Sequence, residues 1–226
     1  MDFEVHADAD AVAAAAAARV LAVAAPGGHV ALAGGSTPRR AYQRLQGSDL
    51  SDLTFWFSDE RAVAPDSEDS NFHMAAGALL DGLPEPRRPR VHRIEGELGP
   101  DAAADRYEAL LRAELGAAPT LDLVLLGLGP DAHTASLFPD KPALDVSDRL
   151  VAPVPEPGLE PLVPRVTFTF GLIDAARDVV LLVAGEDKAE AVARAFGPQA
   201  DPTLPAARLG HGTVLLDEAA AAGLER

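Results

Sequence analysis

Two kinds of hydrophobic pattern alternate along the 226 residues of the chain, and this alternation limits the fold more than any other feature. Short apolar or β-branched runs, most of them followed by glycine or charged residues, predict strands buried on both faces. Stretches rich in Ala, Leu, Glu and Arg, with Gly or Pro at their ends, predict helices between them. This order indicates an α/β fold: a mostly parallel sheet with helices on both faces. The predicted strands are 29–33, 53–57, 121–128, 166–170, 179–184 and 213–216, and the predicted helices are 8–25, 38–45, 71–80, 100–115, 188–196 and 217–221.

The length fits one α/β domain that spans residues 1–226. A folded chain of this size buries roughly 70 to 75% of its extended surface, so one core is sufficient. The proline-rich segments 83–89 and 153–164 are expected to be surface loops, because proline removes backbone donors that a helix or central strand needs. Neither segment resembles a flexible linker between domains.

The charge balance limits the partners of the chain. Acidic residues outnumber basic ones 35 to 19, which gives a net charge of −16. Such a chain repels polyanions and has no long run of basic residues, so nucleic acid is not expected as a partner. The longest apolar stretch, 11–25, is alanine-rich and interrupted by Arg19, and it is too weak and too short for a membrane span. The acidic segment 1–4 lacks the positive start of a secretory signal, and the absence of cysteine is compatible with a reducing compartment. We therefore expect a cytoplasmic protein.

The first candidate site is the turn between a predicted strand and the helix that follows it. Here the chain reads Gly34, Gly35, Ser36 and Thr37, with a proline after them. The glycines let backbone N–H groups face a ligand, Thr37 can cap the helix, and the start of a helix favours an anion. The alternative is an ordinary capped turn, since the loop matches neither the Walker spacing nor the dinucleotide fingerprint.

The second candidate is a charged cluster after an aromatic strand, formed by Asp59, Glu60 and Arg61. Ligands of α/β sheets lie at the ends of parallel strands. An arginine there can bind phosphate oxygens while neighbouring acids hold it in position. The alternative is a solvated charge cluster. Asn71 belongs to a segment, 69–71, that is equally well interpreted as a helix cap.

The third candidate carries the most weight. Asp131 and His133 follow the predicted buried strand 121–128. An unperturbed histidine titrates at about pH 6.5, so it can accept a proton at cellular pH, and a carboxylate two residues earlier can orient its ring. A lone histidine is more often structural than catalytic. Its position after two glycines at the end of a strand favours catalysis here.

The fourth candidate is Lys188. The chain has only two lysines, Lys141 and Lys188. Lys188 follows a strand and a glycine and begins a helix, where the helix dipole disfavours a cation unless an anion shares the space. This position favours a bound ligand, and the alternative is a lysine that faces solvent.

Taken together, these segments resemble the 6-phosphogluconolactonases of the oxidative pentose phosphate pathway. The block that contains Asp131 and His133 is the specific part of the resemblance, with the order Asp-x-His-Thr-Ala-Ser-Leu-Phe-Pro. The family usually has glycine between this Asp and His, where this chain has Ala132; if the position takes a positive φ, alanine strains the loop. The matching stretches are 34–38, 58–61, 69–71, 127–139, 165–167 and 185–188.

The resemblance implies a Rossmann-like sheet and a hydrolase that opens 6-phospho-D-glucono-1,5-lactone to 6-phospho-D-gluconate. It makes His133 the general base for the attacking water, with Asp131 and Arg61 as further catalytic residues. No metal or organic cofactor is required, and a monomer or small homo-oligomer is expected. The implied substrate-binding residues are Gly34, Gly35, Ser36, Thr37, Asn71, Arg165 and Lys188. Which of Arg61, Arg165 and Lys188 faces the phosphate and which faces the oxyanion stays open.

Three alternatives compete with lactone hydrolysis. An amino-sugar phosphate isomerase–deaminase needs an acid–base carboxylate soon after the histidine, and none occurs before Asp140. A sugar-phosphate sensor would bind without turnover, but such regulators usually carry a DNA-binding module, for which one α/β domain leaves no room. In a metal-dependent hydrolase the histidines would need ligand spacing. The six histidines, at 6, 29, 73, 92, 133 and 211, include no such pair, so activity is expected to survive a chelator.

Overall fold

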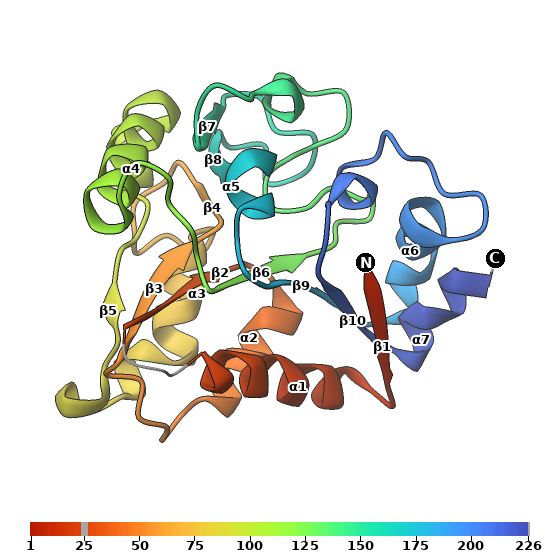
Figure 1. Ribbon diagram of the computed structural model, residues 1–226, viewed down its shortest axis with the longest axis horizontal. Coiled ribbons are helices and arrows are strands. Elements are labelled where there is room, and N and C mark those ends of the chain that lie inside the picture. Colours follow the sequence, from red (N-terminus) through yellow and green to blue (C-terminus); the bar gives the residue numbers. More distant parts are fainter. Residues whose placement is uncertain (24–26, 226) are drawn as a thin grey trace.

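A sheet of seven parallel strands forms the centre of the computed structural model, which describes residues 1–23 and 27–225 (Figure 1). The predicted α/β class is confirmed. The strands are β1 (Asp2–His6), β2 (Gly28–Leu32), β3 (Leu53–Phe57), β5 (Arg90–Val91), β6 (Leu123–Gly127), β9 (Val179–Val183) and β10 (Thr213–Asp217). They lie in the order β1-β10-β9-β6-β2-β3-β5.

Helices cover both faces of this sheet (Figure 1). One face carries α1 (Ala9–Ala22), α2 (Ser36–Arg44) and α3 (Asn71–Ala78). The other carries α4 (Pro100–Leu115) and α5 (Phe170–Asp174), while α6 (Ala189–Phe196) and α7 (Glu218–Ala221) lie towards the β1 end. Short 3₁₀ helices occupy Leu80–Gly82, Glu85–Arg87, Gly96–Leu98, Pro142–Asp145, Glu186–Lys188, Pro205–Arg208 and Ala222–Glu225. Within the described ranges, no helix has both the length and the apolar character that a membrane crossing needs.

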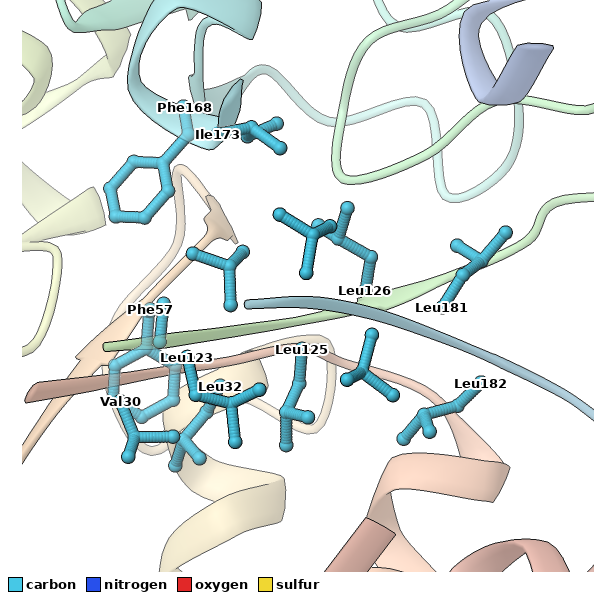
Figure 2. Packing of buried hydrophobic residues seen from close by; sticks show 14 of the residues in the cluster. Val30, Leu32, Phe57, Leu123, Leu125, Leu126, Phe168, Ile173, Leu181 and Leu182 are labelled. Carbon is cyan, nitrogen blue, oxygen red and sulfur yellow. The ribbon is translucent and has the colours of Figure 1, made fainter. Parts of the chain in front are cut away.

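The core explains why the central strands are apolar along their whole length. Figure 2 shows Leu126 and Leu181 on the side of the sheet that faces Phe168, while Leu125 and Leu182 point to the opposite side. All five side chains are buried. Burying a side chain of this size contributes roughly 1.5–3 kcal/mol, so helices must cover both faces for strands of this composition.

A second, antiparallel sheet corrects part of the sequence prediction. It contains β4 (Asp59–Arg61), β8 (Arg165–Phe168) and β7 (Val151–Val154), in the order β4-β8-β7. The strand predicted at 166–170 therefore lies outside the parallel sheet and ends at Phe168. The segment 153–164 was expected to be a loop throughout, but Pro153 and Val154 belong to β7. Proline is tolerated there because β7 is an edge strand, where not every N–H needs a partner.

The helix boundaries follow from their caps. Asp8 caps α1 by accepting a hydrogen bond from the N–H of Ala11, at 2.8 Å. The predicted end of this helix, at residues 24 and 25, lies outside the described residues. The helix predicted to begin at residue 38 begins at Ser36 instead, directly after Gly35. Ser70 caps α3, and α4 has the predicted bounds.

Gly77 offers a direct test of the helical assignment of α3. It is exposed, and a Cβ built on it would lie in open space. We predict that Gly77→Ala raises the free energy of unfolding by up to about 1 kcal/mol, because alanine loses less backbone entropy in a helix. Urea denaturation measures the change. The opposite sign is expected for Gly223→Ala, whose Cβ would meet the carbonyl oxygen of Ala189 at 2.1 Å; equal effects of the two substitutions would contradict the structure.

Candidate active site

A pocket of about 170 Å³ opens at the carboxyl edge of the parallel sheet. Its walls come from the segments that follow β2, β6 and β9, together with β4, β8 and the first residue of α3. This is the edge at which α/β sheets bind ligands. The lining residues are Ala33, Gly34, Gly35, Ser36, Thr37, Pro38, Asp59, Arg61, Asn71, Gly127, Leu128, Gly129, His133, Ala135, Arg165, Leu182, Ala184 and Lys188.

The glycine loop leads from β2 into α2. Gly35 has a φ of 108°, a conformation that L side chains rarely adopt, and it precedes the first helical residue. A Cβ on Gly34 would meet Oδ1 of Asn71 at 2.0 Å, so glycine is needed where that amide packs. The predicted cap by Thr37 is wrong: within the described chain, the start of α2 has no side-chain cap. The first N–H groups of α2 are therefore available to an anion.

A buried hydrogen-bond network connects Asn71, which packs beside this loop, to the histidine segment. The side-chain amide of Asn71 donates to the carbonyl oxygen of Asp59 at 2.9 Å and to its Oδ1 at 3.2 Å. The hydroxyl of Ser136 donates to Oδ2 of Asp59 at 2.6 Å. The sequence placed Asn71 in the site and gave Asp59 the role of holding Arg61, but it did not indicate the bonds of Asp59 with Asn71 and Ser136. The position of Asp59 after a strand was the available signal.

Glu60 anchors the chain beside Arg61. The residue is 2% exposed, and its carboxylate accepts hydrogen bonds from the N–H groups of Asn71 and Phe72, at 2.7 and 2.8 Å. A third bond, at 2.7 Å, comes from the N–H of Arg61 itself. Burial raises the pKa of Glu60, although these bonds act in the opposite direction. The acid therefore holds the backbone of Arg61, while the guanidinium donates to the carbonyl oxygen of Asp69.

Arg165 lies directly opposite Arg61 in the β4–β8 pairing. Its side chain is buried and donates to the carbonyl oxygens of Leu159 and Pro161, each at 3.1 Å. Its guanidinium carbon lies 5.3 Å from the centre of the Phe138 ring. Burial, followed by the nearby charge of Arg61, lowers the pKa of Arg165. Because carbonyl oxygens rather than carboxylates accept their hydrogen bonds, the two arginines keep positive charge available to a ligand.

His133 and Asp131 form a close pair. Nδ1 of the imidazole lies 2.5 Å from Oδ1 of Asp131, and the ring packs on Phe138 with centroids 4.4 Å apart. Burial acts to raise the pKa of Asp131, but its hydrogen bonds to His133 and the charge of that ring outweigh burial and lower the pKa. An ionised Asp131 can accept a hydrogen bond from Nδ1–H, and in that neutral tautomer Nε2 carries the lone pair.

The backbone around His133 confirms one sequence expectation. Ala132, between Asp131 and His133, has a φ of 65°. An L residue in this conformation costs on the order of 1 kcal/mol. Hydrogen bonds hold it there: its N–H donates to the carbonyl oxygen of Gly129, and its own carbonyl accepts from Ala206, at 3.0 and 3.1 Å. Gly129 must stay small, because a Cβ there would meet Nδ1 of His133 at 2.0 Å.

Lys188 lines the pocket from the segment that follows β9. The turn before it depends on Gly185, which has a φ of 109° and donates its N–H to the carboxylate of Asp217 at 2.9 Å. Nζ of Lys188 lies 3.8 Å from the carboxylate of Asp187, whose side chain is exposed. Helix α6 begins one residue later, so the cation lies at a helix start, as predicted.

The structure therefore gathers the residues that the sequence nominated. The residues predicted to be catalytic or to bind substrate all line the pocket except Asp131, which contacts Nδ1 of His133; Glu60 of the charged cluster does not line it. Within the described residues, no group of three His, Asp or Glu side chains is arranged as metal ligands. Fold and site together define a class: an α/β protein with a parallel sheet and a cationic, histidine-containing pocket at its carboxyl edge.

Comparison with known proteins gives the family. A sequence model described as glucosamine-6-phosphate isomerases/6-phosphogluconolactonase matches residues 5–216, so the chain belongs to this family. A 6-phosphogluconolactonase of Synechocystis is 41% identical over 208 residues, which cover 87% of this chain and 85% of the relative. The human 6-phosphogluconolactonase is 38% identical over 180 residues, covering 77% and 69%. The resemblance inferred from the motifs is confirmed.

Solved structures agree with the fold. The 6-phosphogluconolactonase of Leishmania guyanensis has a TM-score of 0.84 and 33% identity, with 100% of this chain and 99% of that chain covered. A monomeric glucosamine-6-phosphate deaminase has a TM-score of 0.80 at 23% identity, with 100% of each chain covered. The second likeness shows the fold alone.

The Asp131–His133 pair yields a prediction about ionisation. We predict that His133→Ala raises the pKa of Asp131, because the hydrogen bond and the charge that lower it come mainly from the imidazole. A carbon NMR titration of the labelled carboxyl groups measures the shift. His73→Ala, at an exposed position on α3, is the matched control and leaves the Asp131 pKa unchanged. An Asp131 pKa that does not respond to removal of His133 would refute the pairing.

Proposed function

We propose that the chain hydrolyses 6-phospho-D-glucono-1,5-lactone to 6-phospho-D-gluconate in the oxidative pentose phosphate pathway. The observation that carries this proposal is the presence, in one pocket, of an imidazole paired with a carboxylate and of the three cations Arg61, Arg165 and Lys188. Relatives named 6-phosphogluconolactonase, similar over most of the chain, support it.

The phosphate is held far from the reacting carbon. The N–H groups of the glycine loop, the hydroxyls of Ser36 and Thr37, and the cations of the pocket bind its oxygens. Lactone hydrolysis also develops negative charge on the carbonyl oxygen, and a cation not used by the phosphate stabilises that oxyanion. Binding at the phosphate fixes the lactone ring relative to His133.

His133 acts as the general base. Asp131 holds the Nδ1–H tautomer, and Nε2 takes a proton from the water whose oxygen attacks the lactone carbon. The bond between that carbon and the ring oxygen then breaks, and the ring oxygen takes the proton from His133 as it leaves. The products are a hydroxyl and a carboxylic acid, which releases its proton to solvent to give the carboxylate, and the histidine returns to its starting form.

The isomerase–deaminase alternative needs a carboxylate that can exchange protons with the sugar. Residues 134–139 contain none. Asp59 does line the pocket, but both of its oxygens accept hydrogen bonds, from Asn71 and Ser136. These bonds occupy both oxygens of Asp59 in the buried network, so hydrolysis is the better proposal.

The domain organisation, compartment, cofactor requirement and oligomeric state of the chain are also part of the proposal. One domain across 1–226 is supported by a pocket whose residues run from Ala33 to Lys188. Action in the cytoplasm, without a cofactor, as a monomer or small homo-oligomer also belongs to the proposal.

The base role predicts a selective loss. In His133→Ala we expect kcat to fall by about 10²–10⁴-fold, the usual contribution of a general base. Affinity for 6-phosphogluconate is expected to stay within severalfold of the wild type, because the glycine loop and the cations that bind the phosphate remain. Lactone hydrolysis is measured above its spontaneous rate, and binding by calorimetry. His73→Ala is the histidine control, and a His133→Ala enzyme with wild-type kcat would disprove the role.

Binding of the substrate by the cations Arg61, Arg165 and Lys188 predicts a dependence on salt. Because the chain carries −16, attraction for a dianionic substrate must be local, and the Debye length falls to about 10 Å at 0.1 M salt. We expect the Michaelis constant to rise with ionic strength, and to rise less steeply in Lys188→Met. Lys141→Met removes the only other lysine, which does not line this pocket, and should keep the wild-type salt response. A wild-type Michaelis constant that does not change with ionic strength would count against binding of the substrate by these cations.

A further inference from the structure

Both tyrosines of the chain are buried, and each connects a helix to the end of a central strand. Tyr42, on α2, donates its hydroxyl hydrogen to the carbonyl oxygen of Ala33 at 2.8 Å and accepts a bond from the N–H of the same residue at 2.9 Å. Tyr107, on α4, accepts from the N–H of Phe57 at 2.8 Å and donates to the carbonyl oxygen of His92 at 2.9 Å.

Ala33 lies where β2 loses its strand neighbours. The pairing with β3 ends at Leu32, and the pairing with β6 covers only Val30 and Ala31. The N–H and the carbonyl oxygen of Ala33 therefore both form their hydrogen bonds with the hydroxyl of Tyr42. A buried amide without a partner is costly, so the position of that hydroxyl determines where this peptide lies.

The next residues are the glycine loop. Gly34 and Gly35 have no side chain with which to anchor themselves, and the conformational freedom of glycine makes the position of this loop depend on the residues that flank it. Tyr42 belongs to the helix that this loop begins. Its hydroxyl therefore links the second turn of α2 back to the end of β2, across the glycine turn that connects them.

We propose that Tyr42 is a positioning residue for the phosphate-binding loop. The inference rests on the proposed function, since it assigns the loop to the phosphate of the substrate. The hydroxyl holds Ala33 so that the N–H groups after it converge on one anion. The aromatic ring packs in the core and does not perform this task, so phenylalanine would keep the packing and lose the alignment.

The test compares Tyr42→Phe with Tyr107→Phe. Both variants lose one hydroxyl from a fully buried ring and two backbone hydrogen bonds, but only the first lies behind the glycine loop. For Tyr42→Phe we expect the dissociation constants of 6-phosphogluconate and of inorganic phosphate, and the Michaelis constant, to rise about tenfold, while kcat changes much less. Tyr107→Phe should raise these constants clearly less than Tyr42→Phe.

Two results would overturn the proposal. One is an unchanged phosphate affinity in Tyr42→Phe. The other is an equal loss of phosphate affinity in both variants, which would indicate a general destabilisation of the fold. If the wild type does not hydrolyse the lactone, the proposed function fails, but phosphate affinity still tests Tyr42. If Tyr42→Phe does not fold, hydrogen exchange of the wild type decides: saturating phosphate should slow exchange at the Ala33 amide, and no change there would also overturn the proposal.

Discussion

Parallel strands end at a common edge of their sheet, and the candidate site depends on this constraint. It brings the segments after β2, β6 and β9 together although they are far apart in the sequence. The small antiparallel sheet then adds Arg61 and Arg165 opposite each other. The result is a concentration of positive charge in a chain of net charge −16, with carbonyl oxygens as the hydrogen-bond partners of the arginines. This charge is the reason for proposing a dianionic ligand.

The central strands were predictable because strands buried on both faces are apolar at every position. The aromatic strand β3 and the helix α4 have their predicted bounds. The edge strand β1 escaped prediction, since its five residues lack the continuous apolar run of the strands that are buried on both faces. The antiparallel sheet escaped as well, because the pairing of β4 with β8 joins segments about a hundred residues apart and leaves no local pattern.

The site was largely predictable for a different reason. The glycine loop, the histidine and Lys188 lie soon after predicted strands, where α/β sheets bind ligands, and the family resemblance implied roles for them. What supports those residues could not be predicted. The bonds of Asp59 with Asn71 and Ser136, and of Tyr42 with Ala33, are tertiary contacts that no spacing in the sequence indicates.

The most direct measurement is a crystal structure of the protein with 6-phosphogluconate bound. The account predicts the phosphate on the glycine loop within reach of the pocket cations, and the carboxylate at C1 within one hydrogen bond, or one water, of Nε2 of His133. A product bound in the reverse direction, or with C1 distant from His133, would contradict the assignment of the histidine as the base and of the loop as the phosphate site.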